Sequence, residues 1–133
     1  MFTGQFAGEI GRWGNMPLPE KHIAVLREEE HEPRSMFLVA GETLAIYSDK
    51  AFGRLVFGLA DSLLKGEDPI EPVRHLVSIH EQVKSKAGKI KIPRKFKEIY
   101  GFEAGMEVCF VGCGEYVEVW ERREWERRSR GGL

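Results

Sequence analysis

The residues of this chain that could bind a ligand are concentrated in one basic segment, residues 84–97. It holds seven basic side chains in fourteen positions and no acidic one. These cations are Lys84, Lys86, Lys89, Lys91, Arg94, Lys95 and Lys97. Charge runs are more often solvated faces than binding sites. Here, however, they surround a glycine-containing turn and alternate along a strand, which predicts one compact patch for an anionic partner.

The other chemistry-bearing residues form no recognisable site. The four histidines share no common spacing, and Cys109 and Cys113 lie in an apolar strand as small core residues. The acidic run at residues 28–32 could hold a divalent metal, but consecutive carboxylates diverge around a helix, which favours a solvated helix end. Phosphate-loop and nucleophile motifs are absent. The sequence therefore predicts no enzyme, no metal site and no cofactor.

Composition points to one small folded protein. The chain has 133 residues, 42% of them hydrophobic and 31% charged, which favours a packed core. The longest apolar stretch is well short of the roughly 20 residues of a membrane span, and the first residues lack a signal-peptide layout. We therefore expect a cytoplasmic protein without membrane contact. Residues 1–70 carry 7 basic and 11 acidic side chains, whereas residues 71–133 carry 13 and 10.

An internal repeat governs the fold prediction. Residues 37–47 align with residues 110–120, and both segments read as an apolar strand, a Gly-Glu turn and a strand ending in an aromatic residue. Residues 14–19 align with 88–93, with a change of one residue in the offset. Phe52 and Trp125 also match. The chain is therefore a tandem duplication.

Each unit is predicted to contain a strand, a turn, a second strand, a helix begun by proline, a hairpin and a final helix. Residues 1–52 form the first unit and 80–128 the second, with connecting helices at 53–79 and a tail at 129–133. The connecting segment predicts a helix capped by Ser48 or Asp49 and ended by Gly66, with a stripe of Phe52, Leu55, Leu59 and Leu63, then a second helix over about 69–79. We expect these helices to pack on each other and on a neighbouring chain.

The short helix of each unit has a predicted inner face. In the second unit Phe96, Ile99 and Tyr100 recur at helical spacing, and Gly101 supplies the stop. In the first unit His22 takes the place of Phe96. We interpret His22 as a core or boundary histidine with its hydrogen bonds satisfied, in preference to a catalytic group.

With these residues in hand, the chain resembles the MraZ family. The resemblance is strongest in residues 86–93 and 100–105, continues through 111–120 and Trp125, and includes Phe2, Gly4 and Pro19. These proteins are bacterial regulators of the division and cell-wall gene cluster. The resemblance implies an α+β, mainly β fold with two SpoVT/AbrB-like units, each a small barrel-like sheet with short helices. It also implies an oligomeric ring that binds double-stranded DNA and is associated with the nucleoid.

The sequence departs from the family signature, an Asp-x-x-x-Arg motif on the turn before the second strand of each unit. The Asp and Arg positions hold Gly11 and Asn15 in the first unit, and Ser85 and Lys89 in the second. Lys89 keeps the positive charge but loses the bidentate fork of arginine, so it suits phosphate better than a base edge. The second turn is therefore the better DNA-binding element, and the first has lost most of that capacity.

The expected site follows from both lines of argument. The predicted DNA contacts are Lys84, Lys86, Lys89, Lys91, Arg94 and Arg12, positioned by the turn glycines Gly14 and Gly88. One alternative is an interaction subunit that has lost DNA binding and assembles with a paralogue whose motifs are intact. An antitoxin of the AbrB type is disfavoured, because only residues 127–133 follow the expected last helix.

Overall fold

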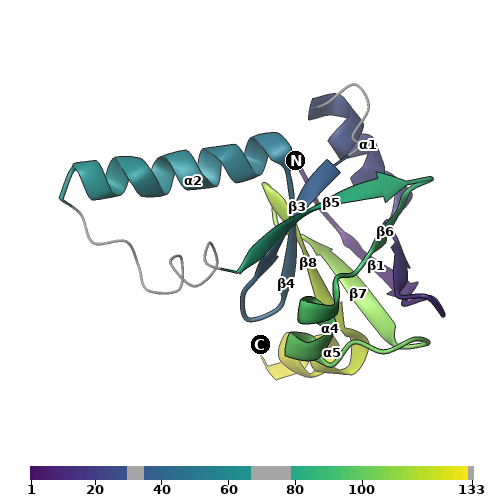
Figure 1. Cartoon of the computed structure of the whole chain (residues 1–133). Helices are drawn as coiled ribbons and strands as arrows, with labels where there is room; N and C mark the ends of the chain where they lie inside the picture. Colours follow the sequence, from purple (N-terminus) through teal and green to yellow (C-terminus); the bar gives the residue numbers. More distant parts are fainter. Residues whose placement is uncertain (30–34, 67–78, 132–133) are drawn as a thin grey trace.

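The structure of the chain, a computed structural model, describes residues 1–29, 35–66 and 79–131 (Figure 1). Its strands are β1 (Gln5–Glu9), β2 (Asn15–Pro17), β3 (Ser35–Ala40), β4 (Leu44–Ser48), β5 (His80–Lys86), β6 (Lys89–Lys91), β7 (Glu107–Gly112) and β8 (Tyr116–Glu121). Its helices are α1 (Glu20–Glu29), α2 (Asp49–Leu64), α4 (Arg94–Tyr100) and α5 (Arg122–Gly131). Each half therefore contains the elements predicted for one unit, in the predicted order.

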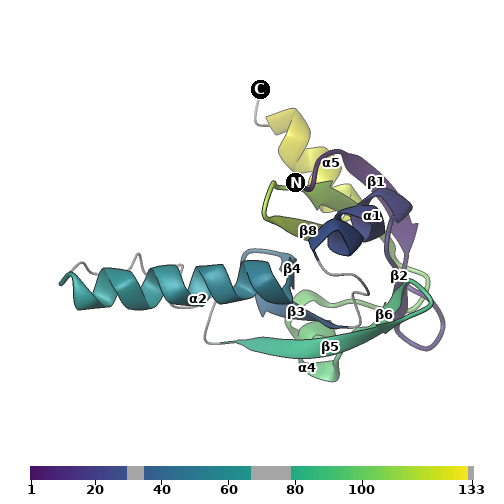
Figure 2. The ribbon, with the colours of Figure 1, turned by 90° about the horizontal axis from the view of Figure 1, so that it is seen from above.

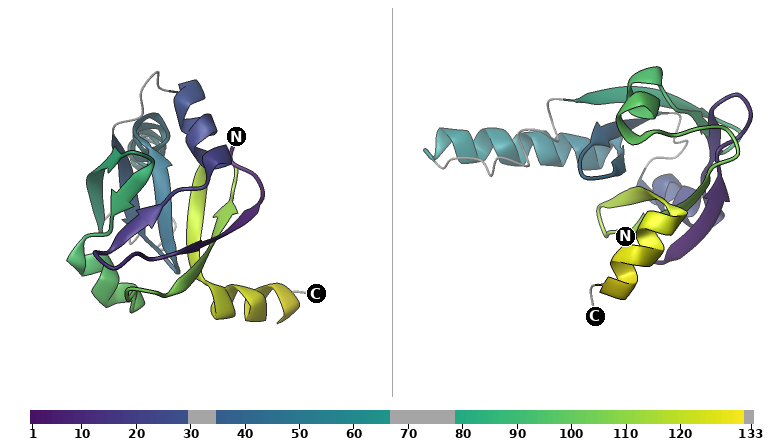
Figure 3. Two further views of the ribbon diagram at one scale, coloured as in Figure 1. Left: turned by 90° about the vertical axis from the view of Figure 1, so that its right-hand side faces the viewer. Right: turned by 90° about the horizontal axis from the view of Figure 1, so that it is seen from below.

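The strands of the two halves interleave in a single sheet. Its order is β1-β7-β8-β4-β3-β5-β6-β2, and β1, β2, β3 and β4 each pair antiparallel with a strand of the other half. The outer strands β1 and β2 follow each other in the chain, so the sheet curls into a nearly closed barrel (Figure 3). The predicted α+β, mainly β class is confirmed. Each half completes the sheet of the other, while the predicted unit boundaries stay predictions.

The repeat is visible in the hydrogen bonds between β2 and β6. Met16 of β2 pairs with Ile90 of β6. On one side of this pair the Leu18 N–H donates to the Gly88 carbonyl at 2.9 Å, and on the other the Ile92 N–H donates to the Gly14 carbonyl at 3.0 Å. Residues that the sequence alignment makes equivalent thus exchange equivalent bonds between the two units, a pairing that the alignment itself did not predict.

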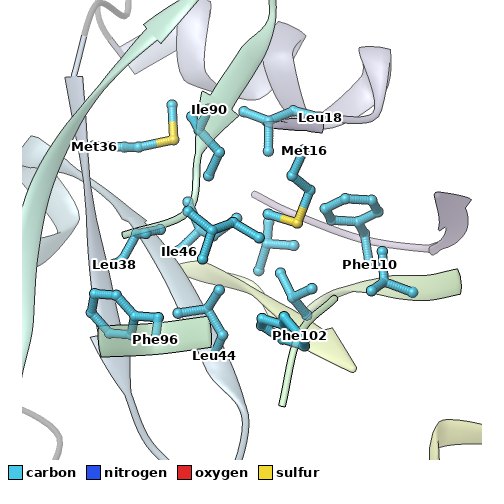
Figure 4. Close-up of a cluster of buried hydrophobic side chains, with 14 of the residues drawn as sticks. Met16, Leu18, Met36, Leu38, Leu44, Ile46, Ile90, Phe96, Phe102 and Phe110 are labelled. Atoms are coloured by element: carbon cyan, nitrogen blue, oxygen red, sulfur yellow. The ribbon is translucent and has the colours of Figure 1, made fainter. Parts of the chain in front are cut away.

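The barrel interior is a continuous apolar core (Figure 4). Met16, Ile90 and Ile92 are at most 1% exposed, which confirms that alternate residues of β2 and β6 point inward. Phe96 is fully buried, but the prediction for Ile99 is wrong, because this side chain is 49% exposed. The reason is that α4 has only seven residues and its inner face is filled by Phe96 and Tyr100.

The hydroxyl of Tyr100 connects the two halves. It accepts a hydrogen bond from the Gly41 N–H at 2.7 Å and donates one to the Gly41 carbonyl at 2.8 Å. Burial raises the pKa of this phenol above its usual value, so it stays protonated and able to donate at neutral pH. The bonds fix α4 against the turn between β3 and β4.

Two helices cover the outer face of the hairpins. On α2, the ring of Phe52 lies 6.5 Å from that of Tyr47, and on α5, the ring of Trp125 lies 5.6 Å from that of Trp120, which aligns with Tyr47. The predicted equivalence of Phe52 and Trp125 is therefore confirmed. The last helix is longer than expected, because α5 continues to Gly131 instead of ending before Arg127. Arg122 supports its first turn through an ion pair with Glu126.

The predicted ends of α2 are confirmed. The Ser48 hydroxyl accepts the Ala51 N–H at 3.0 Å, which caps the helix, and Gly66 has a left-handed φ of 73° just beyond it. The expected helix at 69–79 and the side chain of Leu63 lie outside the described residues, apart from Ile79. None of the described helices is long and apolar enough to cross a bilayer.

The far part of α2 extends away from the barrel (Figure 2). Phe57 is 75% exposed and Leu64 88% exposed, although helices of single domains normally turn such residues inward. Leu55 and Leu59 are half-buried. The projecting helix therefore carries apolar surface that the described residues leave uncovered.

His22 lies in the core, as predicted, but only one of its ring nitrogens has a partner. Its Nε2 lies 3.3 Å from the Thr3 carbonyl, whereas the buried Nδ1 has no hydrogen-bond partner. The rings of Phe2 and Phe6 meet it edge-on at 5.6 and 5.0 Å. This burial lowers the pKa of His22 below its ordinary value of 6.5, and the Thr3 carbonyl offsets only part of the shift.

We predict that His22→Phe raises stability and flattens its dependence on pH. Because the folded pKa is lowered, the unfolded chain binds the proton more readily, and the wild type loses stability as the pH falls below about 6.5. Phenylalanine is the residue at the equivalent position of the other unit. The substitution also removes the unpaired Nδ1 of His22, and this removal should contribute about 1 kcal/mol to stability. Urea unfolding of both proteins from pH 7.5 to 5.5 checks this. Equal losses of stability on acidification would contradict it.

Candidate nucleic-acid interface

The β5–β6 hairpin presents the basic segment. Its turn has only two residues, Ala87 and Gly88, with φ of 54° and 74°. Positive φ at both positions is the type I′ geometry, which matches the twist of the flanking strands. Gly88 takes this conformation without strain, while Ala87 is the only described residue other than glycine with a positive φ. The turn thus holds Lys86 directly opposite Lys89.

Four lysines point outward from this hairpin. Lys84 and Lys86 are exposed on β5, and Lys89 and Lys91 are exposed on β6, while Ile90 between them is buried. We call Lys84, Lys86, Lys89 and Lys91 the lysine face. Like charges opposite each other in a sheet are unfavourable, so a bound anion would relieve the repulsion between Lys86 and Lys89. The outward direction predicted for Lys89 and Lys91 from their alternation with Ile90 and Ile92 is confirmed.

Within the described part of the chain, no carboxylate forms an ion pair with the lysine face. Arg94, also predicted as a contact, differs. It begins α4 and its Nε lies 3.0 Å from the Glu98 carboxylate, with the Arg94 side chain 90% exposed. A phosphate would have to compete with Glu98 for this guanidinium, although exposed pairs of this kind contribute at most about 1 kcal/mol.

The first unit has a different turn, between β1 and β2. The Gly11 N–H donates to the Asn15 carbonyl at 2.8 Å, and the Gly14 N–H donates to the Gly11 carbonyl at 3.0 Å. This is a three-residue loop that ends in Gly14 with φ of 77°. Arg12 and Trp13 occupy its tip, and both are exposed.

The two turns lie at opposite ends of the β2–β6 ladder. Asn15, which follows the first turn, is paired with Lys91, whereas Pro17 is paired with Lys89 beside the second turn. Arg12 is therefore brought to the Lys91 end of the lysine face and away from Lys86 and Lys89. The structure thus divides the predicted contacts between two ends of one surface.

Lys97 is a basic residue of this region that our predicted contacts omitted. Its ammonium packs against Gly14, where a Cβ atom would collide with it. Ile23 of α1 takes the equivalent place against Gly88. Lys97 belongs to the basic run, but only the pairing of the two units brings it to the first turn. Gly14 and Gly88, the predicted turn glycines, both have a positive φ, and each contacts a side chain from a short helix.

No protein-family model matches this chain. It is 28% identical over 128 residues to the transcriptional regulator MraZ of Alkaliphilus oremlandii, covering 96% of this chain and 85% of that protein. It is 27% identical over 132 residues to the transcriptional regulator MraZ of Acetivibrio thermocellus, covering 97% and 87%. This chain is similar to these MraZ proteins over nearly its whole length. The resemblance indicated by its sequence is thereby confirmed.

The motif positions of this MraZ-like chain can now be placed. In the second unit Lys89 points outward, but Ser85 is half-buried and pairs with Ile90. In the first unit Gly11 and Asn15 are joined by their backbones across the loop. Of the four positions, only Lys89 presents a cation. The side chains nearest to it on the same surface, Lys86 and Lys91, add charge that the Asp-x-x-x-Arg motif does not contain.

The described residues contain no group of three His, Cys, Asp or Glu side chains that could hold a metal ion. Burial and the Glu118 carboxylate raise the pKa of Cys113 to about 12, so its thiol is not a nucleophile at neutral pH. Most of the acidic run at 28–32 lies outside the described residues. Cavities of about 540 and 310 Å³ lie beside α5 and are lined by none of the lysine face.

Proposed function

We propose that this chain is a DNA-binding transcriptional regulator of the MraZ type. One observation carries the proposal: four lysines project from one face of the β5–β6 hairpin, and no described carboxylate neutralises them. A face of this kind binds phosphates. The names of its relatives, both transcriptional regulators, support the same class of function.

The chemistry of the face indicates how it would recognise DNA. Lysine is a point charge that neutralises phosphates, whereas bidentate contacts to guanine are a property of arginine. Contacts of this type position a protein on the duplex and carry little sequence information. We therefore propose that the protein binds DNA with weak discrimination between sequences and performs no catalytic step. We also propose that it is cytoplasmic and associated with the nucleoid.

We further propose that the chain acts as a homo-oligomer, as a ring. Each lysine face is small, and several faces on one DNA molecule raise the overall affinity through effective concentration. The projecting part of α2, with Phe57 and Leu64 exposed, supports contact between copies. A paralogue with intact motifs is a second candidate for this contact.

Salt dependence of duplex binding tests the proposed function. Fluorescence anisotropy of labelled DNA, measured at several salt concentrations, should give a logarithm of affinity that falls linearly with the logarithm of salt. The slope should be about −0.9 for each phosphate neutralised. If wild-type protein of verified oligomeric mass does not bind DNA at low salt, the proposed function is wrong.

We predict that Phe57→Glu lowers the oligomeric mass without unfolding the chain. Phe57 is 75% exposed on the projecting part of α2, so the substitution costs little within one chain. If Phe57 lies in an interface between copies of the chain, Phe57→Glu would bury a charge there, which is strongly unfavourable. Light scattering coupled to gel filtration measures the mass, and circular dichroism the fold. Lys65→Glu, on the exposed end of the same segment, is the matched control.

The interaction-subunit alternative is favoured by the same exposed helix and by the altered motifs. It requires the lysine face to be covered in the assembled protein. Acetylation of exposed lysines, followed by mass spectrometry, separates the two cases. Modification of Lys86 and Lys89 in the oligomer supports DNA binding, whereas protection of both supports the alternative.

A further inference from the structure

Trp13 is the exposed aromatic residue at the tip of the first turn. It retains 72% of its accessible surface, whereas Trp120 is 7% exposed. Tryptophan side chains are usually highly buried, so packing of the fold does not explain a tryptophan that is exposed on a turn. The loop that carries it is well defined by two backbone hydrogen bonds, at 2.8 and 3.0 Å. The ring is therefore presented by an ordered turn.

The surroundings of Trp13 are cationic. The Arg12 guanidinium lies 5.4 Å from the ring centroid, and Lys97 packs against Gly14, the next residue along the chain. The Ile92 N–H holds this turn to the end of β6, beside Lys91. Trp13 thus differs from Phe57 and Leu64, which are exposed on the apolar helix α2. An aromatic ring among cations at the end of a lysine face matches a nucleic acid better than an apolar partner.

We propose that Trp13 and Arg12 form a stacking site for a nucleobase that has left the helical stack of DNA. This inference rests on the proposed function and replaces the expectation that the first turn has little role. With Arg12 near one side of the indole and most of the ring exposed, a base can stack on the open face. Arg12 and Lys97 then lie close to the phosphates that flank this base.

Such a site would distinguish distorted DNA from an intact duplex. Bases inside an intact duplex are covered by their neighbours, whereas a gap or an easily kinked step makes a base available. Stacking on an aromatic side chain is tolerant of sequence and contributes roughly tenfold in affinity. The lysine face would supply general affinity, and Trp13 would direct the protein to distorted sites.

The test uses the full-length oligomer and three DNA probes of one sequence: an intact duplex, a duplex with a single-nucleotide gap, and the single strand. Wild type should bind the gapped duplex about tenfold more tightly than the intact one. Trp13→Ala should abolish this preference and leave affinity for the intact duplex unchanged, while Trp13→Phe retains part of it. Lys86→Ala/Lys89→Ala should weaken binding to both duplexes equally and keep the preference. A preference for the single strand over the gapped duplex would identify free strands as the source of the base and still support stacking, provided that Trp13→Ala removes it.

Several outcomes overturn the inference. If wild type binds intact and gapped duplexes equally, or if Trp13→Ala keeps the preference, the stacking site does not exist although the proposed function stands. If wild type binds no DNA, both fall. The emission of Trp13, obtained by comparing wild type with Trp13→Phe, should be quenched by acrylamide in the free oligomer and protected by gapped DNA. Protection already in the free oligomer would show that another copy covers the ring and would also overturn the inference.

Discussion

The double substitution Lys86→Ala/Lys89→Ala is expected to weaken duplex binding about tenfold and to flatten its salt dependence. The two lysines face each other across the type I′ turn, both exposed, so one phosphate or two adjacent phosphates can contact the pair. Each exposed contact contributes about 0.5–1 kcal/mol, and the two together correspond to roughly a tenfold change. The salt slope should become shallower by about 0.9 for each phosphate that the variant no longer neutralises.

Two further variants make this measurement specific. Lys50→Ala/Lys65→Ala removes the same charge from α2 and its end, so it should bind DNA as wild type does. Lys89→Arg restores the guanidinium of the family signature and should raise affinity and discrimination between sequences. If both double variants lose the same affinity, net charge is responsible, and the proposed role of the β5–β6 turn is wrong.

The order of elements was predictable because its signals are local. Alternation at Ile90 and Ile92 determines which face of β6 is buried, Ser48 caps α2, and Gly101 stops α4. The same alternation predicted the direction of Lys89 and Lys91. Each of these features depends on neighbours within a few residues, so the sequence contains the information directly.

The arrangement of the two units was not predictable from these signals. Pairing of β2 with β6 joins strands from opposite halves of the chain, and neither strand shows in its sequence that its partner lies in the other unit. That pairing places Lys97 against Gly14 and separates Arg12 from Lys86. Ile99 is a smaller example of the same limit. Its apolar side chain and helical spacing predicted burial, but the neighbouring elements leave it exposed.

Gly88→Val is expected to destabilise the chain by about 2–3 kcal/mol and to disrupt the lysine face. Gly88 has φ of 74°, a conformation that costs a β-branched residue about 1–3 kcal/mol. A Cβ atom there would also lie 3.0 Å from Cδ1 of Ile23, and the Gly88 carbonyl must keep accepting the Leu18 N–H. Urea unfolding and anisotropy of labelled duplex measure the two effects.

Matched variants separate the causes of this destabilisation. Gly53→Val, at a position on α2 where nothing lies within 4 Å, should be nearly neutral. Gly88→Asn keeps the left-handed backbone, which asparagine tolerates, and therefore isolates the contact with Ile23. If Gly88→Asn folds and binds DNA while Gly88→Val does not, the turn geometry presents the lysines. Wild-type stability and affinity in Gly88→Val would instead mean that the hairpin does not need the type I′ turn.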